Sequence, residues 1–315
     1  MTGESAFIDA LRALATDPAA RGLTDDAAVL NVGGATLVLT HDMIVEGVHF
    51  LSEDPAGDVA WKLVAVNLSD LAAKGARPIG ALMGYGLSGD AAWDRAFLAG
   101  LDAALTAFSL PLLGGDTVSL PAGAPRSLGL TAIGRAEFPV PARSGARSGE
   151  TLWVSGTIGD SGGGLRMLRD GEDGASSLVE RYRRPTPRLE AGLRLAPLAS
   201  AMMDVSDGLL IDAARMAEAS GARLTIDLAR IPLSPALVEQ QGDDRGARLV
   251  AATAGDDYEL LFCAPDAAAQ EIFALAQELG LSLLPIGHVA EGGGLELIDG
   301  EDLVALPTRL GWEHR

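Results

Sequence analysis

Aspartate residues recur along the chain just after short apolar or glycine-rich runs. Asp42 interrupts the strand-like run of residues 37–50, and Asp70 ends the segment Asn-Leu-Ser-Asp at 67–70. The others in such positions are Asp25, Asp26, Asp116, Asp204, Asp207, Asp256 and Asp257. If several of these carboxylates converge, their mutual repulsion raises their pKa values unless cations neutralise them. Oxygen-only ligands suit Mg²⁺, which usually bridges a few carboxylates to substrate phosphates.

Taken singly, each of these acids has an ordinary structural explanation. Turn or cap positions would explain Asp25, Asp26, Asp116 and Asp207, and a solvated helix position would explain Asp70. Their shared place at the ends of apolar runs favours a common site, because open sheets place the ligand crevice at strand ends.

A glycine-rich segment, Gly-Asp-Ser-Gly-Gly-Gly at 159–164, offers a second kind of site. Successive backbone N–H groups at a helix N-terminus bind phosphate. The segment lacks the Gly-Lys-Ser/Thr ending of a P-loop and the spacing of a dinucleotide fingerprint, so a flexible strand-to-helix turn is an equal alternative. The sequence shows neither a Ser/His/Asp order nor an activated cysteine, which leaves covalent catalysis without a candidate.

The composition is that of a folded protein with cores rich in Ala, Leu and Val, since 48% of the 315 residues are hydrophobic and 4% aromatic. That length suits one large domain or, better, two. The formal charge of −19 argues against a nucleic-acid or anionic-membrane surface, since both demand clustered Lys and Arg. The one cysteine, Cys263, excludes intramolecular disulfides and is expected in the core. Finding neither a secretory signal nor a run of about 20 apolar residues, we expect a cytoplasmic protein.

Hydrophobic periodicity alternates between helix and strand patterns along the chain. Helices are expected over residues 5–15, 58–74, 90–108, 188–196, 208–219 and 266–279. Strands are expected over residues 27–32, 35–40, 79–87, 111–113, 127–135, 151–155, 222–228, 258–264 and 282–289. A stretch rich in Pro, Gly, Ser and Arg at 138–149 marks a domain boundary. The alternation predicts an α/β or α+β architecture and leaves the strand order open.

Six collinear motifs resemble those of the thiamine-monophosphate kinases, a family of the ATP-binding superfamily named for aminoimidazole ribonucleotide synthetase. They lie at residues 24–30, 40–50, 65–76, 114–117, 204–209 and 255–260. The resemblance implies an enzyme that transfers the γ-phosphoryl group of ATP to thiamine monophosphate by direct in-line transfer, assisted by several Mg²⁺ ions. The product would be thiamine diphosphate, in the last step of its biosynthesis.

The same resemblance implies a fold and an assembly. Residues 1–138 would form an N-terminal α/β domain that binds ATP and metal, 139–149 a linker, and 150–315 a C-terminal α+β domain. The strands of the N-terminal domain would form a barrel across a homodimer. ATP and Mg²⁺ would lie in the active-site cleft between the domains, and neither nucleic acid nor a membrane would be a partner.

Matching the motif positions residue by residue gives the expected ligands. For the metal ions they are Asp26, Thr40, His41, Asp42, Asp70, Asp116, Asp204 and Asp207. For ATP they are Gly115, Asp116, Arg143 and Ser206, and for thiamine monophosphate His49, Asp256 and Trp312. Apart from the resemblance, His49 fits a structural or surface histidine, and Trp312 fits a terminal residue folded back on its own domain.

Three positions depart from the family pattern. Thr24 stands where glycine is usual, which changes the shape of the turn before Asp25. His41 replaces a usual Thr or Ser beside Asp42, so a ligand there must be its backbone carbonyl or be absent. Asp256 stands where Glu is also found, which shortens the reach to the substrate.

The implied chemistry agrees with the residue types. The attacking phosphate oxygen is already anionic near neutral pH, so no general base is required and no catalytic residue beyond the metal ligands is expected. Positioning and charge neutralisation supply most of the catalysis of phosphoryl transfer. The cationic thiazolium suits Asp256 and a cation–π contact with Trp312, worth roughly 0.5 to 2 kcal/mol.

Related activities are the main alternatives. Selenophosphate synthetase would carry a reactive Cys or selenocysteine near its N-terminus, and hydrogenase-maturation relatives a C-terminal cysteine, and this sequence has neither. Aminoimidazole ribonucleotide synthetase is harder to exclude, although residues 45–50 and 255–259 favour the thiamine enzyme. A non-catalytic divalent-cation module is the alternative of a different class.

Overall fold

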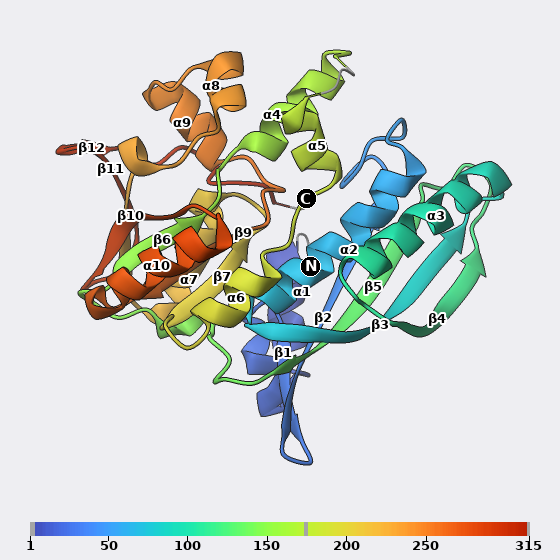
Figure 1. Cartoon of the computed structure of the whole chain (residues 1–315), viewed down its shortest axis with the longest axis horizontal. Coiled ribbons are helices and arrows are strands. Elements are labelled where there is room, and N and C mark those ends of the chain that lie inside the picture. Colours follow the sequence, from blue (N-terminus) through green and yellow to red (C-terminus); the bar gives the residue numbers. More distant parts are fainter. Residues whose placement is uncertain (1–3, 173–175, 314–315) are drawn as a thin grey trace.

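The computed structural model of the chain describes residues 4–172 and 176–313. Its strands form two sheets, one of five strands and one of seven, and helices pack against both (Figure 1). All strands up to residue 136 belong to the first sheet and all strands from residue 151 onward to the second. Each half of the chain therefore builds its own sheet.

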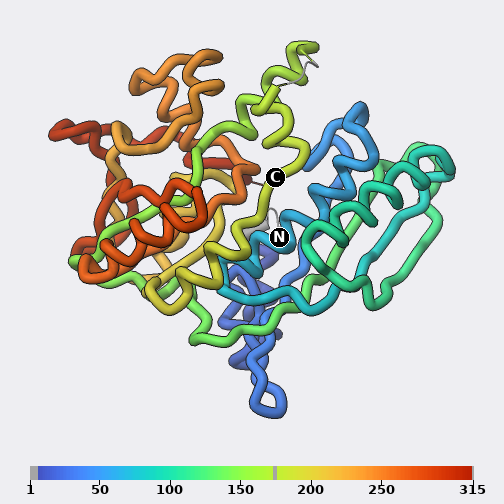
Figure 2. The backbone as a smooth tube through the Cα atoms, viewed as in Figure 1, coloured from blue at the N-terminus to red at the C-terminus, as the bar shows by residue number. Residues whose placement is uncertain are grey.

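The first sheet has the order β1-β2-β5-β3-β4 and is antiparallel except for the β3–β4 pair. Its strands are β1 (Ala28–Val32), β2 (Ala35–Val45), β3 (Ala76–Leu87), β4 (Leu112–Ser119) and β5 (Ser127–Ala136). The helices of this half are α1 (Glu4–Arg12), η1 (Pro18–Leu23), α2 (Ala56–Ala73) and α3 (Ala91–Ala107). The β1–β2 hairpin projects beyond the rest of the molecule (Figure 2).

The second sheet has the order β12-β11-β8-β10-β6-β9-β7 and is antiparallel except for the β8–β11 pair. Its strands are β6 (Thr151–Ser155), β7 (Ala201–Val205), β8 (Arg223–Asp227), β9 (Glu259–Ala264), β10 (Leu283–Ala290), β11 (Gly294–Asp299) and β12 (Asp302–Val304). Its α-helices are α4 (Asp160–Arg169), α5 (Ser177–Arg183), α6 (Leu189–Leu195), α7 (Leu209–Ser220), α8 (Pro235–Gln241), α9 (Arg245–Ala252) and α10 (Ala269–Leu279). Short 3-10 turns are η2 (Arg143–Gly145), η3 (Leu228–Arg230) and η4 (Asp266–Ala268).

Helix α2 is the central element of the molecule. Most of its positions are apolar or small, and 14 of its 18 residues are buried. A helix that is apolar all round is covered by neighbours on more than one side. The neighbours of α2 include α3, β2, β3 and β5 from the first half and α5, α6, β7 and β9 from the second. Two of its polar residues, Lys62 and Ser69, bond to side chains of the second half.

Strand β4 is exposed along its whole length. Among the residues that the structure describes it pairs only with β3, and its Leu113 and Val118 are 61% and 54% exposed. Because β1 and β4 are the outer strands of an open sheet, the described residues of one chain form no closed barrel. The barrel expected from the sequence would need strands of a second chain.

Two of the expected strands are longer in the structure. The strand expected at 35–40 continues as β2 to Val45, and the strand expected at 111–113 continues as β4 to Ser119. Asp42 and Asp116 therefore lie inside strands, and the prediction that these two acids follow strand ends is wrong. In β2 the polar pair His41-Asp42 interrupts the apolar pattern, and in β4 the exposed run Gly-Gly-Asp-Thr at 114–117 interrupts it. The sequence pattern also did not indicate α5, α8, α9, β7, β11 or β12.

Cys263 is fully buried in β9, where its Sγ lies 3.6 Å from the sulfur of Met216, and this confirms the expected core position. Burial raises the pKa of its thiol far above the ordinary value, so Cys263 offers no nucleophile. Within residues 4–172 and 176–313, no helix has both the length and the apolarity that crossing a membrane requires.

Candidate active site

A cleft of about 530 Å³ lies between the two halves of the molecule. Residues expected to bind ligands line it from both sides. The first half contributes Asp26, Asp42, His49 and Asp70, and the second half contributes Arg143, Asp204, Ser206, Asp207, Asp256 and Trp312. One cavity therefore gathers residues that are as far as 286 positions apart in the sequence (312 minus 26).

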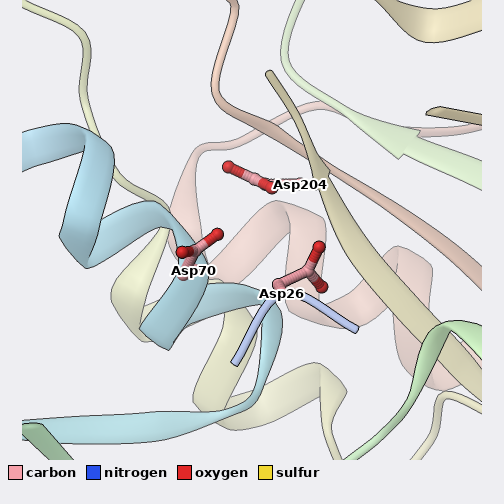
Figure 3. Close-up of side chains that lie close together, drawn as sticks. All are labelled: Asp26, Asp70 and Asp204. Atoms are coloured by element: carbon pink, nitrogen blue, oxygen red, sulfur yellow. The ribbon is translucent and has the colours of Figure 1, made fainter. Parts of the chain in front are cut away.

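Three carboxylates form the centre of this cleft. Asp26 precedes β1, Asp70 lies in the last turns of α2, and Asp204 lies in β7. One oxygen atom from each lies within 4.8 Å of an oxygen atom of the other two. The three side chains approach one another from three separate elements (Figure 3). Such a spacing allows one cation to contact all three.

Most of the carboxylates here repel one another and are shielded from water. Burial raises the pKa of Asp70 well above its ordinary value, and the charges of Asp42 and Asp204 raise it further. Burial, and then the charge of Asp26, does the same to the pKa of Asp204. Burial with the charges of Asp26 and Asp207 raises the pKa of Asp42 to about 6. A divalent cation would relieve this repulsion, and the all-oxygen donor set fits Mg²⁺.

Asp26 differs from its neighbours because fixed cations surround it. The Nζ of Lys74 lies 2.6 Å from Oδ2 of Asp26, and the Nε of Arg143 donates to Oδ1 at 2.7 Å. Burial alone would raise the pKa of Asp26, but Arg143 and Lys74 bring it down to about 2. Lys74 is fully buried and also lies 2.5 Å from Asp25. Asp26 is therefore held ionised, as a metal ligand must be.

Strand β2 carries Thr40, His41 and Asp42, whose side chains alternate between its two faces. Thr40 and Asp42 lie on the side of α2, where the Thr40 hydroxyl donates to Asp70 and Asp42 lines the cleft. The His41 ring lies on the other side, with its Nδ1 2.9 Å from the hydroxyl oxygen of Thr131. The ring therefore points away from the carboxylate centre, which leaves the His41 carbonyl as the group that could serve as a ligand.

The loop that carries Ser206 and Asp207 is held by a buried aspartate. Oδ2 of Asp212 accepts the backbone N–H groups of Ser206, Asp207 and Gly208 at 3.1, 3.1 and 3.2 Å. Arg215 donates to Asp207 at 2.6 Å and to Asp212 at 2.8 Å. Burial, with the charge of Asp207, raises the pKa of Asp212 to about 6. Sequence reasoning missed Asp212, because one acid in the first turn of a helix resembles an ordinary surface residue.

The cleft wall also contains His49, Asp256 and Trp312. The backbone N–H of Trp312 donates to the carbonyl of Asp207 at 2.8 Å, while its indole stays 50% exposed in the cleft wall. Gly311 allows this close approach, because a Cβ at that position would lie 2.5 Å from the Asp207 carbonyl oxygen. The segment is thus docked through its backbone.

Gly115 and Asp116 are not in this cleft. Both lie in the exposed strand β4, and Oδ1 of Asp116 accepts the backbone N–H of Thr117 at 2.9 Å. Glycine is required at 115, since a Cβ there would lie 1.9 Å from the carbonyl oxygen of Met83 on β3. One chain therefore does not bring these two residues to the cleft that ten of the other twelve expected ligands line.

The glycine-rich segment at 159–164 uses its N–H groups internally. The backbone N–H of Gly159 donates to Asp257 Oδ2 at 2.7 Å, and that of Ser161 donates to Oδ1 at 3.4 Å. Asp257 is fully buried. Its carboxylate occupies the place that a bound phosphate would take, so the structure favours the strand-to-helix turn over a phosphate cradle.

Asn67, Ser69 and Lys74 support the carboxylate centre, and sequence reasoning gave them no separate role. The backbone N–H of Asp42 donates to Asn67 Oδ1 at 3.0 Å, and the Ser69 hydroxyl donates to Asp204 Oδ2 at 2.6 Å. All three supporting side chains are buried. Polar residues in a helix that is apolar on nearly every side were the signal that could have identified them.

Two family models match this chain. Residues 24–136 match the AIR synthase related protein, N-terminal domain, and residues 147–300 match the AIR synthase related protein, C-terminal domain. The chain therefore belongs to the AIR synthase related family. The hydrogenase maturation protein HypE in complex with ATP shares its fold, with a TM-score of 0.72 over 95% of this chain and 92% of that one, at 21% identity.

Individual relatives show which members of this family the chain resembles. The thiamine-monophosphate kinase of Caulobacter vibrioides is 42% identical over 309 residues, which cover 95% of this chain and 86% of the relative. The Salmonella typhimurium enzyme is 36% identical over 302 residues, covering 93% and 90%. A solved structure of AaThiL complexed with AMPPCP and TMP has a TM-score of 0.86 at 31% identity, covering 99% of this chain and 97% of that chain. Within its family, the chain belongs to the thiamine-monophosphate kinases.

Proposed function

We propose that this chain transfers the γ-phosphoryl group of ATP to thiamine monophosphate and releases thiamine diphosphate and ADP, as the last step of thiamine diphosphate biosynthesis. The observation that carries this proposal is the carboxylate centre of Asp26, Asp70 and Asp204 in a cleft between the two halves. Family membership supports it, as does the similarity to a structure that is described as holding AMPPCP and TMP. Its phosphoryl donor, ATP, is a cytoplasmic metabolite, so we place the protein in the cytoplasm.

The acidic centre accounts for the chemistry. Two polyanions must come together, and the nucleophile is a phosphate oxygen that is already ionised, so no side chain needs to accept a proton. Asp26, Asp42, Asp70 and Asp204 would hold several Mg²⁺ ions, with Asp207 at a further ion and Thr40 and the His41 carbonyl completing the set. Bound Mg²⁺ would neutralise the phosphate charges and align the reacting groups.

The remaining residues of the cleft are assigned to the two substrates by the chemistry of their side chains. Arg143 and Ser206 lie beside the carboxylate centre and are proposed to contact ATP. Asp256, His49 and Trp312 line the same cleft and are proposed to bind the thiamine moiety. An acid and a half-exposed indole suit a cationic thiazolium, through charge and cation–π attraction.

A homodimer is part of this proposal. Strand β4 has an unpaired edge, and Met43, Leu82 and Leu113 on three strands of its sheet are 53%, 43% and 61% exposed. Exposed apolar strands of this kind invite pairing with another chain. Pairing across a dimer would close the expected barrel, and it offers Gly115 and Asp116 a route to a cleft that they do not reach in one chain. Sedimentation equilibrium should then give twice 32.4 kDa.

The division of the chain is proposed along the same lines. Residues 1–138 would form the N-terminal domain, 139–149 the linker and 150–315 the C-terminal domain. This division is supported by the separate sheets and by family models that end at residue 136 and begin again at residue 147.

The direct test is to mix the purified protein with ATP, Mg²⁺ and thiamine monophosphate and to measure thiamine diphosphate. Product is expected with Mg²⁺ and none with excess EDTA. If Mg²⁺ binds but no thiamine diphosphate forms under metal-replete conditions, the chain is a cation-binding module and the proposed activity is wrong.

A further inference from the structure

We propose that Lys62 is the positioning residue of the proposed thiamine-binding part of the cleft, an inference that rests on the proposed roles of His49 and Asp256. Lys62 lies on α2 and belongs to none of the expected ligand sets. Its side chain is 2% exposed. An ammonium group is expensive to bury unless it is fully paired, so its partners reveal what it does.

The Lys62 ammonium joins both residues that are proposed to hold the thiamine moiety. Its Nζ donates to Oδ2 of Asp256 at 2.9 Å and to the backbone carbonyl of His49 at 2.9 Å. It also lies 4.0 Å from the ring centroid of Tyr182, within cation–π range. His49 and Lys62 come from the first half of the chain, and Tyr182 and Asp256 from the second, so this group of residues is assembled only when the halves are packed together.

Asp256 is held in a conformation that needs such support. Its φ of +69° is rare for a residue with a side chain. Its backbone N–H donates to the carbonyl of Ser206 at 2.7 Å, and its Oδ1 accepts the hydroxyl of Tyr258 at 3.1 Å. With Lys62 on Oδ2, both carboxylate oxygens have fixed donors, yet the side chain stays 26% exposed to the cleft.

This arrangement gives the Lys62–Asp256 pair a role in binding. A buried ion pair adds little net stability compared with apolar residues of similar size, so stability alone does not account for a lysine here. A carboxylate that is already fixed loses little freedom when a cation binds it, which improves affinity. Lys62 also compensates the Asp256 charge, so that the acid is not an isolated anion in a partly dry cleft.

Lys62 also holds His49 in place. It fixes the backbone of His49 through the carbonyl, and the His49 ring accepts the backbone N–H of Val45 on Nδ1 at 3.0 Å. A neutral imidazole with Nδ1 as acceptor carries its proton on Nε2. Lys62 therefore fixes the backbone from which the His49 side chain extends, and the hydrogen bond from Val45 sets the tautomer of the His49 ring.

The test is the effect of Lys62→Met on the two substrates separately. Methionine keeps an unbranched apolar stem and removes the ammonium. We expect the KM for thiamine monophosphate to rise by about 10-fold or more and the KM for ATP to stay within about twofold. Lys62→Gln, which keeps an N–H donor, should give an intermediate KM for thiamine monophosphate and serves in place of Lys62→Met if the latter does not fold.

Arg184→Met is the matched control. Arg184 also joins the second half to α2, with its Nε 3.7 Å from Asp58 and its guanidinium over the Trp61 ring, but it does not line the cleft. Losing this contact should leave both KM values unchanged. An equal rise of the thiamine monophosphate KM in Arg184→Met would show that any weakened packing between the halves is enough, which would overturn the role of Lys62.

A double-mutant cycle shows whether Lys62 acts through Asp256. Asp256→Asn alone should raise the KM for thiamine monophosphate, and adding Lys62→Met to it should raise that KM little further. Wild-type protein that makes no thiamine diphosphate would refute the proposed function itself. If the wild type is active and Asp256→Asn raises this KM, but Lys62→Met leaves it unchanged, lowers it, or raises both KM values equally, only the role of Lys62 is refuted.

Discussion

The hydroxyl of Ser69 on α2 donates a hydrogen bond of 2.6 Å to Oδ2 of Asp204 on β7. Both residues are buried, and the bond joins the central helix to the sheet of the second half at the carboxylate centre. The orientation of Asp204 therefore depends on a residue from the opposite half. The same helix carries Asp70 and the Asn67 amide that accepts the Asp42 N–H, so α2 aligns the acids as a group.

Ser69→Ala should reduce kcat/KM for ATP by about 10-fold, because a hydrogen bond to a carboxylate in a buried site is among the stronger ones. The variant should fold, since alanine suits a buried helix position. Steady-state kinetics at saturating thiamine monophosphate measures the effect. Ser127→Ala is the control, because that hydroxyl makes only a 3.5 Å contact to Pro125 outside the cleft. Equal kinetics for the two variants would rule out a role for the Ser69–Asp204 bond.

Asp204→Asn should reduce kcat by about 100-fold or more, because the amide cannot replace an anionic oxygen facing a divalent cation. Burial and repulsion already disfavour the charge of this carboxylate, so the variant should unfold in EDTA at the same temperature as the wild type or a higher one. Asp42→Asn should behave in the same way. Steady-state kinetics and thermal unfolding of each variant and the wild type test this prediction. Wild-type turnover in either variant would show that its acid is not a metal ligand.

Magnesium should stabilise the protein more at about pH 7.5 than at about pH 5. The pKa of Asp42 is raised to about 6, so between about pH 4 and 6 the folded protein holds a proton that the unfolded chain has released. This proton stabilises the fold in EDTA, and the contribution is lost as the pH rises through 6. Asp212, with its pKa also raised to about 6, acts in the same direction. The Mg²⁺-induced change in Tm at the two pH values measures the difference, and equal changes would contradict it.

Trp312→Ala should raise the KM for thiamine monophosphate by about 2- to 30-fold and leave the KM for ATP nearly unchanged, as expected for the loss of one cation–π contact. The indole is 50% exposed in the cleft wall, so little packing is lost with it. Trp312→Phe keeps an aromatic face and should recover most of the affinity. If both substrates lose affinity equally, the residue has a structural role.

The acids of the centre could be identified from the sequence because each lies in a short, recognisable motif. Asp26, Asp42, Asp70 and Asp204 all line one cleft, as the convergence argument required. The prediction that these acids follow strand ends was wrong for Asp42, which lies inside β2. Four acids reach one place because α2 is packed between two sheets, and this packing depends on contacts between distant segments that no local pattern records.

Other features of the site could not be read from the sequence for the same reason. Lys62 on a helix resembles an ordinary solvated lysine, and its ion pair with Asp256 joins segments 194 positions apart. Asp212 resembles any acid at the start of a helix until the N–H groups of residues 206–208 are seen to point at it. Gly115 and Asp116 match their motif, yet β4 places them on an exposed edge, because an edge strand shows no apolar pattern that fixes where it lies.

The central claim is that the carboxylates of this cleft hold divalent cations that bring ATP and thiamine monophosphate together. A crystal structure with Mn²⁺ in place of Mg²⁺ and an unhydrolysable ATP analogue tests it most directly, because the anomalous signal of manganese locates each ion. We expect manganese peaks at about 2.1 Å from carboxylate oxygens of Asp26, Asp70 and Asp204, with phosphate oxygens completing the coordination. A bound analogue whose manganese ions lie away from these three side chains would contradict the account.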